Sequence, residues 1–263
     1  MNQPLAYVHP QAKIANNVVI EPFVTIHKNV EIGEGTWIGS NVTIMEGARI
    51  GKNCKIFPGS VISAIPQDLK FDGEDTIVRI ADNVTIREFV TINRGTKASF
   101  ETVINENTLI MACAHIAHDC SIGKNCIIAN AALLAGHITV DDYAIIGGQV
   151  AIHQFCNIGP HVMISGGSLV NKDVPPYTKG ARTPLSFVGI NSIGLRRRGF
   201  SPEKINEIQD IYRILYQKSF NVTQALEFIE AEMPATSERD EIVYFINNSS
   251  RGIMKGYNRK FNL

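Results

Sequence analysis

A six-residue period runs through most of this chain and constrains its fold more than any other feature. Isoleucine, leucine or valine stands at every sixth position over residues 8–62, 80–92 and 104–170. A small or β-branched residue follows most of these four positions later, and Gly or Asn often stands between the two. Neither a helix of period 3.6 nor an alternating strand of period 2 produces this repeat. Short strands joined by tight turns do produce it, because β-branched residues suit strands while Gly and Asn suit turns.

Each group of six residues then forms one side of a coil, with the periodic residue pointing inward. Three sides per coil give about 18 residues per turn, and the coils stack about 4.8 Å apart as a parallel β-helix. Residues 63–79 and 95–103 lack the apolar pattern, although the periodic residues on either side of each segment remain a multiple of six apart. We interpret these segments as loops that leave the coil and return to it, and loops on a rigid scaffold often carry binding residues.

The period stops near residue 190, which predicts a change of structure there. Ser201 followed by Pro202 has the pattern of a helix start, and apolar residues recur beyond it at helical spacing. We therefore expect a mainly β fold, with a parallel β-helix over residues 1–190 followed by an α-helical domain over residues 191–263.

The charge balance and the cysteine content limit the kinds of partner and the cellular compartment that we expect for this chain. The formal net charge is zero, so no global positive potential attracts nucleic acid. The N-terminus lacks the regions of a signal peptide, and the longest weakly polar stretch, residues 125–140, is too short to span a bilayer. Five cysteines form no disulfide framework. These features predict a cytoplasmic protein with reduced thiols, no nucleic-acid partner and no transmembrane segment.

Residues 111–123, "MACAHIAHDCSIG", gather two cysteines and two histidines: Cys113, His115, His118 and Cys120. A tetrahedral metal site would need all four side chains to converge. The six-residue count places Cys120 in the inward small position, which is also the position of Cys54, Cys126 and Cys156. His118 stands two residues after the periodic Ile116 and should face outward. We therefore predict buried structural cysteines and no metal at this segment.

The count also assigns His118, His137 and His153 to the same face on three successive coils, about 5 Å apart from coil to coil. His115 lies at the corner that enters this face, and the loop at 63–79 interrupts the face further along the rod. Four histidines and an irregular loop thus share one region. This concentration predicts a functional site.

Gly136 occupies the same place in its group of six as His118, one coil further along. A glycine there would leave a backbone N–H beside the imidazole. Acyl transfer requires at least a base to activate the nucleophile and an N–H donor to stabilise the oxyanion. The alternative interpretation is that Gly136 is one more turn glycine.

Several segments resemble the hexapeptide-repeat acyltransferases, and among them the UDP-N-acetylglucosamine O-acyltransferases of bacterial lipid A biosynthesis. The segments that carry the resemblance are "ISAIPQDLKFDGE", "TINRGT", "MACAHIAHDCSIG", "AGHITVDDYAIIGG", "HQFCNIGPHVM", "DVPPY" and "GLRRRGF". The resemblance extends from Val8 through the C-terminal helices. It implies a left-handed coil and a homotrimer with active sites between subunits. It also implies that a (3R)-3-hydroxyacyl chain moves from acyl carrier protein to the 3-hydroxyl of UDP-N-acetylglucosamine, without a cofactor.

The resemblance implies catalytic roles for particular residues. His118 would be the general base, and the Gly136 N–H would stabilise the oxyanion. Asp119 would orient or tune His118, although neighbours along an extended strand point apart. Asp68 and Lys70 match family residues that contact the sugar and assist turnover.

Further residues match substrate-binding positions of the family. The positions that would line the nucleotide-sugar and acyl site are Gln67, His115, His137, His153 and Gln154. The positions that would bind UDP are Asn191, Arg197 and Arg198, since a guanidinium suits phosphate oxygens.

The chain departs from the family pattern at two positions, and two other positions lead to an expectation about the length of the acyl chain. Ile193 stands where Glu is frequent, and Asn93 stands where His is common. Met163 and Gly166 occupy the stretch that measures the acyl chain in the family. A glycine there leaves the groove open, so we expect a long chain of about fourteen carbons or more.

Three other functions fit parts of the pattern. A γ-type carbonic anhydrase would hold zinc on stacked histidines, but His118, His137 and His153 stand at different places in their groups of six. Another hexapeptide acyl- or acetyltransferase would keep the base and change the donor. A purely structural rod should carry a regular outward ladder and no histidine cluster.

Overall fold

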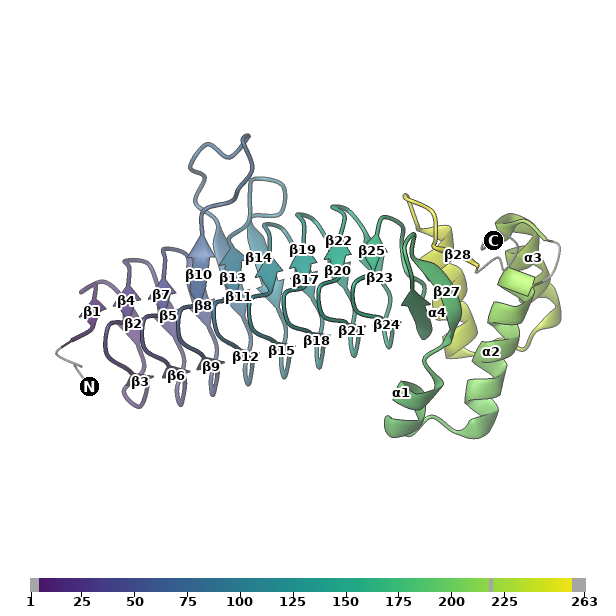
Figure 1. Ribbon diagram of the computed structural model, residues 1–263, viewed down its shortest axis with the longest axis horizontal. Coiled ribbons are helices and arrows are strands. Elements are labelled where there is room, and N and C mark those ends of the chain that lie inside the picture. The colour runs from purple at the N-terminus through teal and green to yellow at the C-terminus, as the bar shows by residue number, and fades with distance from the viewer. Residues whose placement is uncertain (1–4, 218–219, 257–263) are drawn as a thin grey trace.

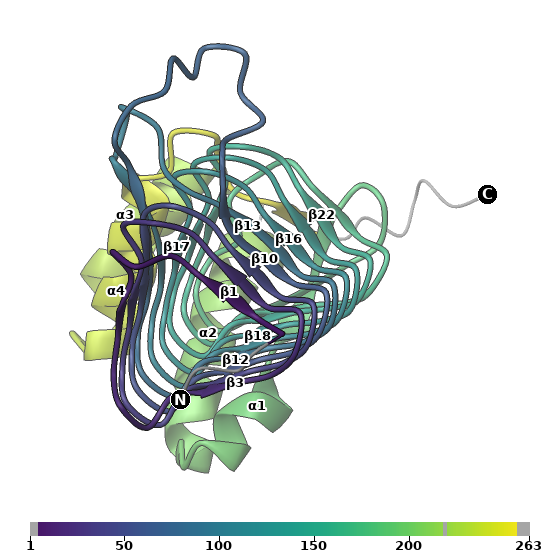
Figure 2. The ribbon, with the colours of Figure 1, turned by 90° about the vertical axis from the view of Figure 1, so that its left-hand side faces the viewer.

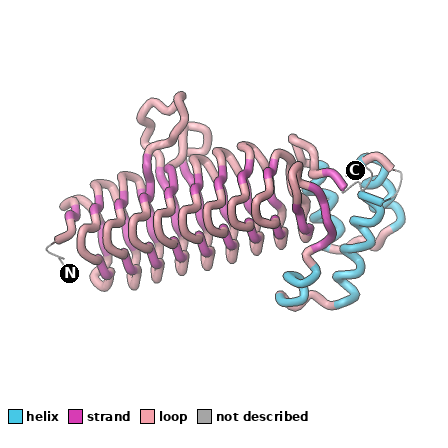
Figure 3. Tube along the Cα trace, viewed as in Figure 1, coloured by secondary structure: helices cyan, strands magenta, loops and turns pink. Residues whose placement is uncertain are grey.

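The chain forms an elongated three-sided prism with a helical unit at one end (Figure 1). A computed structural model describes residues 5–217 and 220–256. Among these residues, short strands form the three walls of the prism and helices follow in the C-terminal part (Figure 3). The mainly β fold with C-terminal helices that the sequence predicts is therefore confirmed.

We name the three walls sheets A, B and C. Sheet A consists of β1 (Tyr7–Val8), β4 (Thr25–Ile26), β7 (Thr43–Ile44), β10 (Val61–Ala64), β13 (Thr91–Asn93), β16 (His115–Ile116), β19 (Leu133–Leu134), β22 (Ala151–Ile152) and β25 (Leu169–Val170). Sheet B consists of β2 (Lys13–Ile14), β5 (Glu31–Ile32), β8 (Ala48–Ile50), β11 (Ile77–Ile80), β14 (Glu101–Ile104), β17 (Ser121–Ile122), β20 (Thr139–Val140) and β23 (Asn157–Ile158). Sheet C consists of β3 (Val19–Ile20), β6 (Trp37–Ile38), β9 (Lys55–Ile56), β12 (Thr85–Ile86), β15 (Leu109–Ile110), β18 (Ile127–Ile128), β21 (Ile145–Ile146), β24 (Met163–Ile164), β26 (Thr178–Ala181), β27 (Ser186–Ile190) and β28 (Lys255–Gly256).

The coil is left-handed, as the family resemblance implied. Seen from the N-terminal end, the chain passes anticlockwise from sheet A to sheet B to sheet C as it recedes from the viewer (Figure 2). We name the prism edges by the sheets that they join in chain order: the AB, BC and CA edges.

The six-residue period has two structural causes. The periodic residues point inward and form one continuous core, in which Ile38, Ile116 and Ile146 are fully buried. The third residue after each periodic residue turns the corner, frequently with a positive φ, as at Asn53 (54°) and Asn125 (56°). Asparagine tolerates this left-handed conformation, which explains why it recurs between the two apolar positions.

Both interruptions of the period are loops that rise from the AB edge (Figure 2). The loops span residues 65–76 and 94–100 and are therefore shorter than the predicted segments 63–79 and 95–103. The difference arises at their feet, where β11 and β14 continue to pair, with Ile77 opposite Glu101. Two loops that are separate in the sequence thus stand side by side above one edge.

The C-terminal helices are α1 (Ser192–Arg197), α2 (Pro202–Gln217), α3 (Val222–Glu232) and α4 (Ser237–Asn247). They have a core of their own, which includes Leu195, Ile208 and Ile229. Residues 218–219 and 257–263 of the predicted helical domain, and 1–4 of the predicted β-helix, lie outside the described residues. None of the helices in the described ranges combines the length and apolar character needed to cross a bilayer.

The outward faces of the three sheets differ in character towards the C-terminal end of the prism. Sheet C presents an apolar ladder in paired register, formed by Leu109, Ile127, Ile145 and Met163. Sheet A presents Leu133, Ala151 and Leu169, with both leucines about half exposed. Sheet B presents the polar residues Ser121, Thr139 and Asn157. Two of the three walls therefore offer apolar surface next to the CA edge.

Candidate active site

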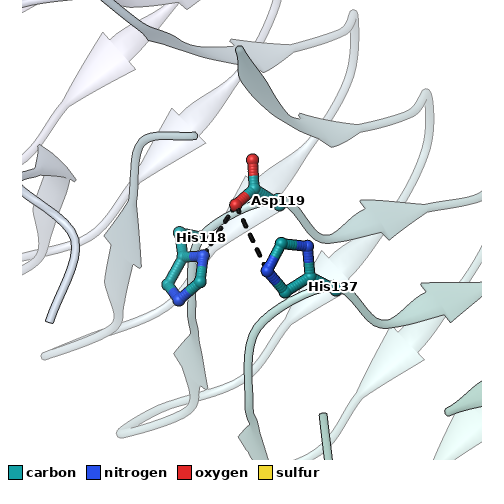
Figure 4. A group of neighbouring side chains, drawn as sticks. All are labelled: His118, Asp119 and His137. Atoms are coloured by element: carbon teal, nitrogen blue, oxygen red, sulfur yellow. Dashed lines mark hydrogen bonds and ion pairs between the residues drawn. The ribbon is translucent and has the colours of Figure 1, made fainter. Parts of the chain in front are cut away.

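His118, Asp119 and His137 meet at the AB edge (Figure 4). His118 and Asp119 lie between β16 and β17, and His137 follows β19 on the next coil. The Nδ1 atom of His118 lies 2.7 Å from Oδ2 of Asp119, and Nε2 of His137 lies 3.7 Å from the same oxygen. The two imidazole rings meet edge to face, with their centroids 5.0 Å apart.

The backbone conformation at the corner directs the Asp119 side chain towards His118. The φ of Asp119 is +59°, so the chain is in the left-handed conformation and not in an extended one. The expectation that the two side chains point apart is therefore wrong at this position. The pair is also well covered, because the Asp119 side chain is fully buried and that of His118 is 12% exposed.

Hydrogen bonds hold the buried Asp119 carboxylate in its ionised form. Its oxygens accept from the backbone N–H of Thr96 (2.9 Å), the hydroxyl of Thr96 (2.7 Å), the hydroxyl of Ser99 and the ring of His118. Burial alone would raise the pKa of this carboxyl, but the hydrogen bonds from Ser99, His118 and Thr96 outweigh it and lower the pKa to about 2. Because an ionised carboxylate can only accept, Nδ1 of His118 donates and Nε2 keeps its lone pair. The ring is thereby arranged as a base.

Gly136 lies directly against the His118 ring. A Cβ atom at position 136 would stand 2.6 Å from Cε1 and 2.8 Å from Nε2 of His118. The matching positions on other coils of sheet A carry long side chains, including Lys28, Glu46 and Gln154, so the turn itself does not require glycine. Gly136 is small because His118 occupies the space above it. Its N–H enters no hydrogen bond among those formed within the described chain.

The three clustered groups could face a common cation, since one ligand atom of each lies within 4.8 Å of the others. Their lone pairs are already committed, however. The Asp119 oxygens accept four hydrogen bonds, and Nδ1 of His118 carries a proton. Each neutral imidazole then offers one nitrogen lone pair. Two such lone pairs are fewer than the three protein ligands that catalytic zinc sites use. The arrangement therefore favours proton transfer over metal binding.

The cysteines of this segment do not converge on the histidines. The Cys120 thiol is buried in the prism and donates to the carbonyl of Ala135 at 3.1 Å. Burial raises the pKa of this thiol to about 12. Cys54, Cys126 and Cys156 are buried as well, whereas Cys113 is exposed.

The remaining histidines flank the pair unequally. Nδ1 of His115 lies 2.7 Å from the Thr91 hydroxyl on the outer surface of sheet A, and burial followed by the nearby His118 lowers the pKa of His115. His153 is exposed, and its Nδ1 lies 3.1 Å from the backbone oxygen of its neighbour Gln154. Phe155, which the sequence analysis did not single out, stacks on His137 with centroids 4.6 Å apart.

The longer loop carries Gln67, Asp68 and Lys70 above the same edge. Gln67 and Lys70 are exposed, and the Asp68 carboxylate accepts the backbone N–H of Lys70 at 2.9 Å. The foot of the loop is tied by Asn93, whose buried amide donates to the Ile65 carbonyl at 3.0 Å. This bond gives a structural role to the Asn93 departure from the family pattern.

Asn191 and Arg198 lie at the BC edge and therefore away from His118 in the same chain. Asn191 is buried, donates to the His161 carbonyl at 2.9 Å and caps α1. The Arg198 guanidinium donates to the Tyr143 carbonyl at 2.9 Å and covers the Tyr143 ring. Arg197 and Ile193 project from α1 as exposed side chains, and Ile193 is 60% exposed.

An aromatic stack at the BC edge was not predicted from the sequence. His161 lies between the rings of Tyr143 and Tyr177, at centroid distances of 5.0 and 5.6 Å. Burial, followed by the Arg198 charge, lowers the pKa of His161 to about 4, so the ring is neutral near pH 7. The six-residue count could have revealed this stack, since all three aromatic residues stand at the corner position of the same edge.

Met163 lies on the outward face of sheet C, and Gly166 follows at the CA edge. Gly166 is exposed, and a Cβ atom there would come within 3.0 Å of the Gly148 carbonyl. The surface at this edge is therefore formed by backbone, with Gly148 and Gly166 stacked on successive coils.

Comparisons with known proteins agree with this architecture. A family model described as UDP N-acetylglucosamine O-acyltransferase, domain 2, matches residues 173–254, and a bacterial transferase hexapeptide model matches 29–64 and 101–136. The chain is 46% identical to acyl-[acyl-carrier-protein]–UDP-N-acetylglucosamine O-acyltransferase of Xylella fastidiosa, over 96% of this chain and 97% of that protein.

Solved structures match over nearly the whole chain. A UDP-N-acetylglucosamine acyltransferase from Bacteroides fragilis superposes with a TM-score of 0.95 at 52% identity, covering 97% of this chain and 100% of that one. The corresponding enzyme of Francisella novicida gives a TM-score of 0.95 at 42% identity, with coverage of 98% and 95%. The resemblance drawn from the sequence is thus confirmed, and the chain belongs to the UDP-N-acetylglucosamine O-acyltransferase family.

Proposed function

We propose that this enzyme transfers a (3R)-3-hydroxyacyl group from acyl carrier protein to the 3-hydroxyl of UDP-N-acetylglucosamine, the first step of lipid A biosynthesis. The names and the full-length similarity of its relatives support the reaction. The observation that carries the mechanism is the His118–Asp119 pair with Gly136 directly against the imidazole.

The proposed chemistry uses groups of the chain alone. Nε2 of His118 removes the proton from the sugar 3-hydroxyl, and the oxygen attacks the thioester carbonyl. The Asp119 carboxylate stabilises the imidazolium that forms. The Gly136 N–H donates to the oxyanion of the tetrahedral intermediate. When the intermediate collapses, the carbon–sulfur bond breaks and His118 returns the proton to the carrier thiolate.

The outward faces support a homotrimer with composite active sites. If each copy places its CA edge near a three-fold axis, sheet A of one copy and sheet C of the next flank one cleft. The AB edge with His118 then faces the BC edge with Arg198 of the neighbouring copy across that cleft. In this arrangement the sugar would lie at the base and the diphosphate would lie at the guanidinium.

The same cleft suits the acyl chain. Its walls would be the apolar residues of sheets A and C, including Leu133 on one side and Ile145 and Met163 on the other. Gly166 would leave the far end of the groove open, which supports a donor of about fourteen carbons or more. The free thiols support the cytoplasmic location predicted from the sequence.

An assay with chelator-treated protein tests the reaction. We expect transfer from 3-hydroxyacyl carrier protein but not from acetyl-CoA, and loss of transfer in His118→Ala. Activity that required added zinc, or that survived in His118→Ala, would contradict the base mechanism.

Mixed assemblies test the composite site. When expressed alone and assayed with UDP-N-acetylglucosamine well below the KM of the variant, His118→Ala and Arg198→Ala are each expected to be inactive, or nearly so. Co-expressed in equal amounts, they should recover roughly a quarter of wild-type activity, because that fraction of the clefts combines an intact His118 with an intact Arg198. Failure to recover activity in mixed trimers of verified composition would argue against sites shared between copies.

A further inference from the structure

The shorter loop, residues 94–100, closes over the Asp119 carboxylate. Oδ1 of Asp119 accepts from the Thr96 N–H and from the Ser99 hydroxyl, and Oδ2 accepts from the Thr96 hydroxyl and from His118. Each carboxylate oxygen therefore receives two hydrogen bonds, and one of these four bonds comes from the base. The other three come from a loop that leaves the coil after β13, one coil before His118.

We propose that Thr96 and Ser99 are positioning residues of this acyltransferase, which fix the Asp119 carboxylate so that it orients His118 and not His137. This inference rests on the proposed function, in which His118 is the base. The coil alone does not supply this arrangement, because the donors stand on a loop outside the six-residue period.

Competition between two imidazoles makes such positioning necessary. Nε2 of His137 lies 3.7 Å from Oδ2 of Asp119, which is about 1 Å further than Nδ1 of His118. A small rotation of the carboxylate would bring Oδ2 closer to His137 and move it away from His118. The three donors from the loop oppose this rotation, since all of them would lose their geometry.

The loop donors also moderate the charge that His118 meets. Hydroxyl groups that donate to a carboxylate spread its negative charge and make it a weaker acceptor. When one hydroxyl is removed, the two remaining loop donors still hold the carboxylate beside His118, and its less-shared charge favours the protonated form of His118 more strongly. Less of the base is then free at a given pH. A loop that served only to cover the edge would have no such effect.

His115 and His137 also face this pair, from sheet A and from the next coil respectively. Neither contacts Thr96 or Ser99 among the hydrogen bonds of the described chain. Substitutions in the loop therefore change the surroundings of Asp119 without replacing another titratable group.

The test compares Ser99→Ala and Thr96→Val with Thr96→Ser, which retains the hydroxyl, and with Ser121→Ala, an exposed hydroxyl on sheet B. The pH dependence of kcat/KM is measured for each variant. We expect the acid limb to move to higher pH by on the order of half a unit in Ser99→Ala and Thr96→Val. We also expect a loss of roughly tenfold in kcat at neutral pH, and wild-type profiles for the two controls.

Histidine ¹³Cε1 NMR gives a second readout that does not need turnover. The midpoint of the His118 titration should move in the same direction in Ser99→Ala and Thr96→Val. An equal loss of rate at every pH, with unmoved NMR midpoints, would overturn the positioning role. If the wild type itself transferred no acyl group while the NMR midpoints still moved, the proposed function would fail and the hydrogen-bond argument would stand.

Discussion

Replacing Gly136 with alanine would place a methyl group against the His118 ring. The added carbon would stand 2.6 Å from Cε1, whereas unstrained carbon contacts lie at about 3.5–4.0 Å. The ring or the coil must therefore move by about 1 Å. The ring is anchored at Nδ1 by Asp119, so the movement displaces Nε2, the atom that would remove the proton.

The expected loss follows from this displacement. A shift of about 1 Å in a catalytic group can lower the rate by about a hundredfold, so we expect kcat/KM to fall by that factor. Alanine keeps its backbone N–H, which means that the loss reports on the base and not on the oxyanion donor. Overpacking should destabilise the fold by about 1–3 kcal/mol, a decrease of several degrees in Tm.

Steady-state transfer assays and thermal unfolding measure both effects. The control is Lys28→Ala, at the matching position of a distant coil, which should leave both quantities unchanged. In a His118→Ala background the methyl group has room, so Gly136→Ala should no longer lower Tm. Wild-type activity in Gly136→Ala, or an equal loss of Tm in both backgrounds, would refute the reasoning.

Three other substitutions test separate parts of the site. The folded-state pKa of Asp119, about 2, lies below its ordinary value of 3.8, so ionised Asp119 stabilises the fold above about pH 5 and this contribution is lost as the pH falls towards 2. Asp119→Asn should lower the free energy of unfolding by about 2 kcal/mol at pH 7, and urea titrations should show the difference from wild type shrinking between pH 5 and pH 2. Gly166→Met should shift the preferred donor to shorter chains, each methylene changing relative kcat/KM by about tenfold or more, and an unchanged length profile would remove Gly166 from the groove. Arg198→Lys should raise the KM for UDP-N-acetylglucosamine about tenfold with little change in kcat, because lysine cannot present a planar fork to phosphate; an unaltered KM would place the nucleotide elsewhere.

The sequence was most informative where structure repeats. The periodic residues had to be buried together, and the count alone assigned His118 and His137 to one face on successive coils. It also placed the loop at 63–79 on the same face, whereas the structure shows that the second loop rises beside it. The helix at Ser192–Arg197 was not predicted, because six residues are too few to show a helical period.

The details of the site could not be read from the period. An extended strand would direct Asp119 away from His118, and only the left-handed corner at Asp119 brings the two together. Thr96 and Ser99 carried no signal, because a loop outside the coil has no register from which its contacts can be counted. His153 shares the face of His137 in the count, yet Phe155 occupies the position against that ring.

The sequence by itself determined the prism, its inward core and the face on which the histidines gather, because a six-residue repeat fixes which way each side chain of a coil points. The tertiary structure alone decided how Asp119 is held and why position 136 must be glycine, because these depend on distances between coils and loops that are separate in the chain. It also separated Arg198 from His118 onto different edges, since the helices follow the prism and α1 returns to the BC edge. Periodicity encodes direction, whereas the contacts that make a base reactive arise only when distant segments pack together.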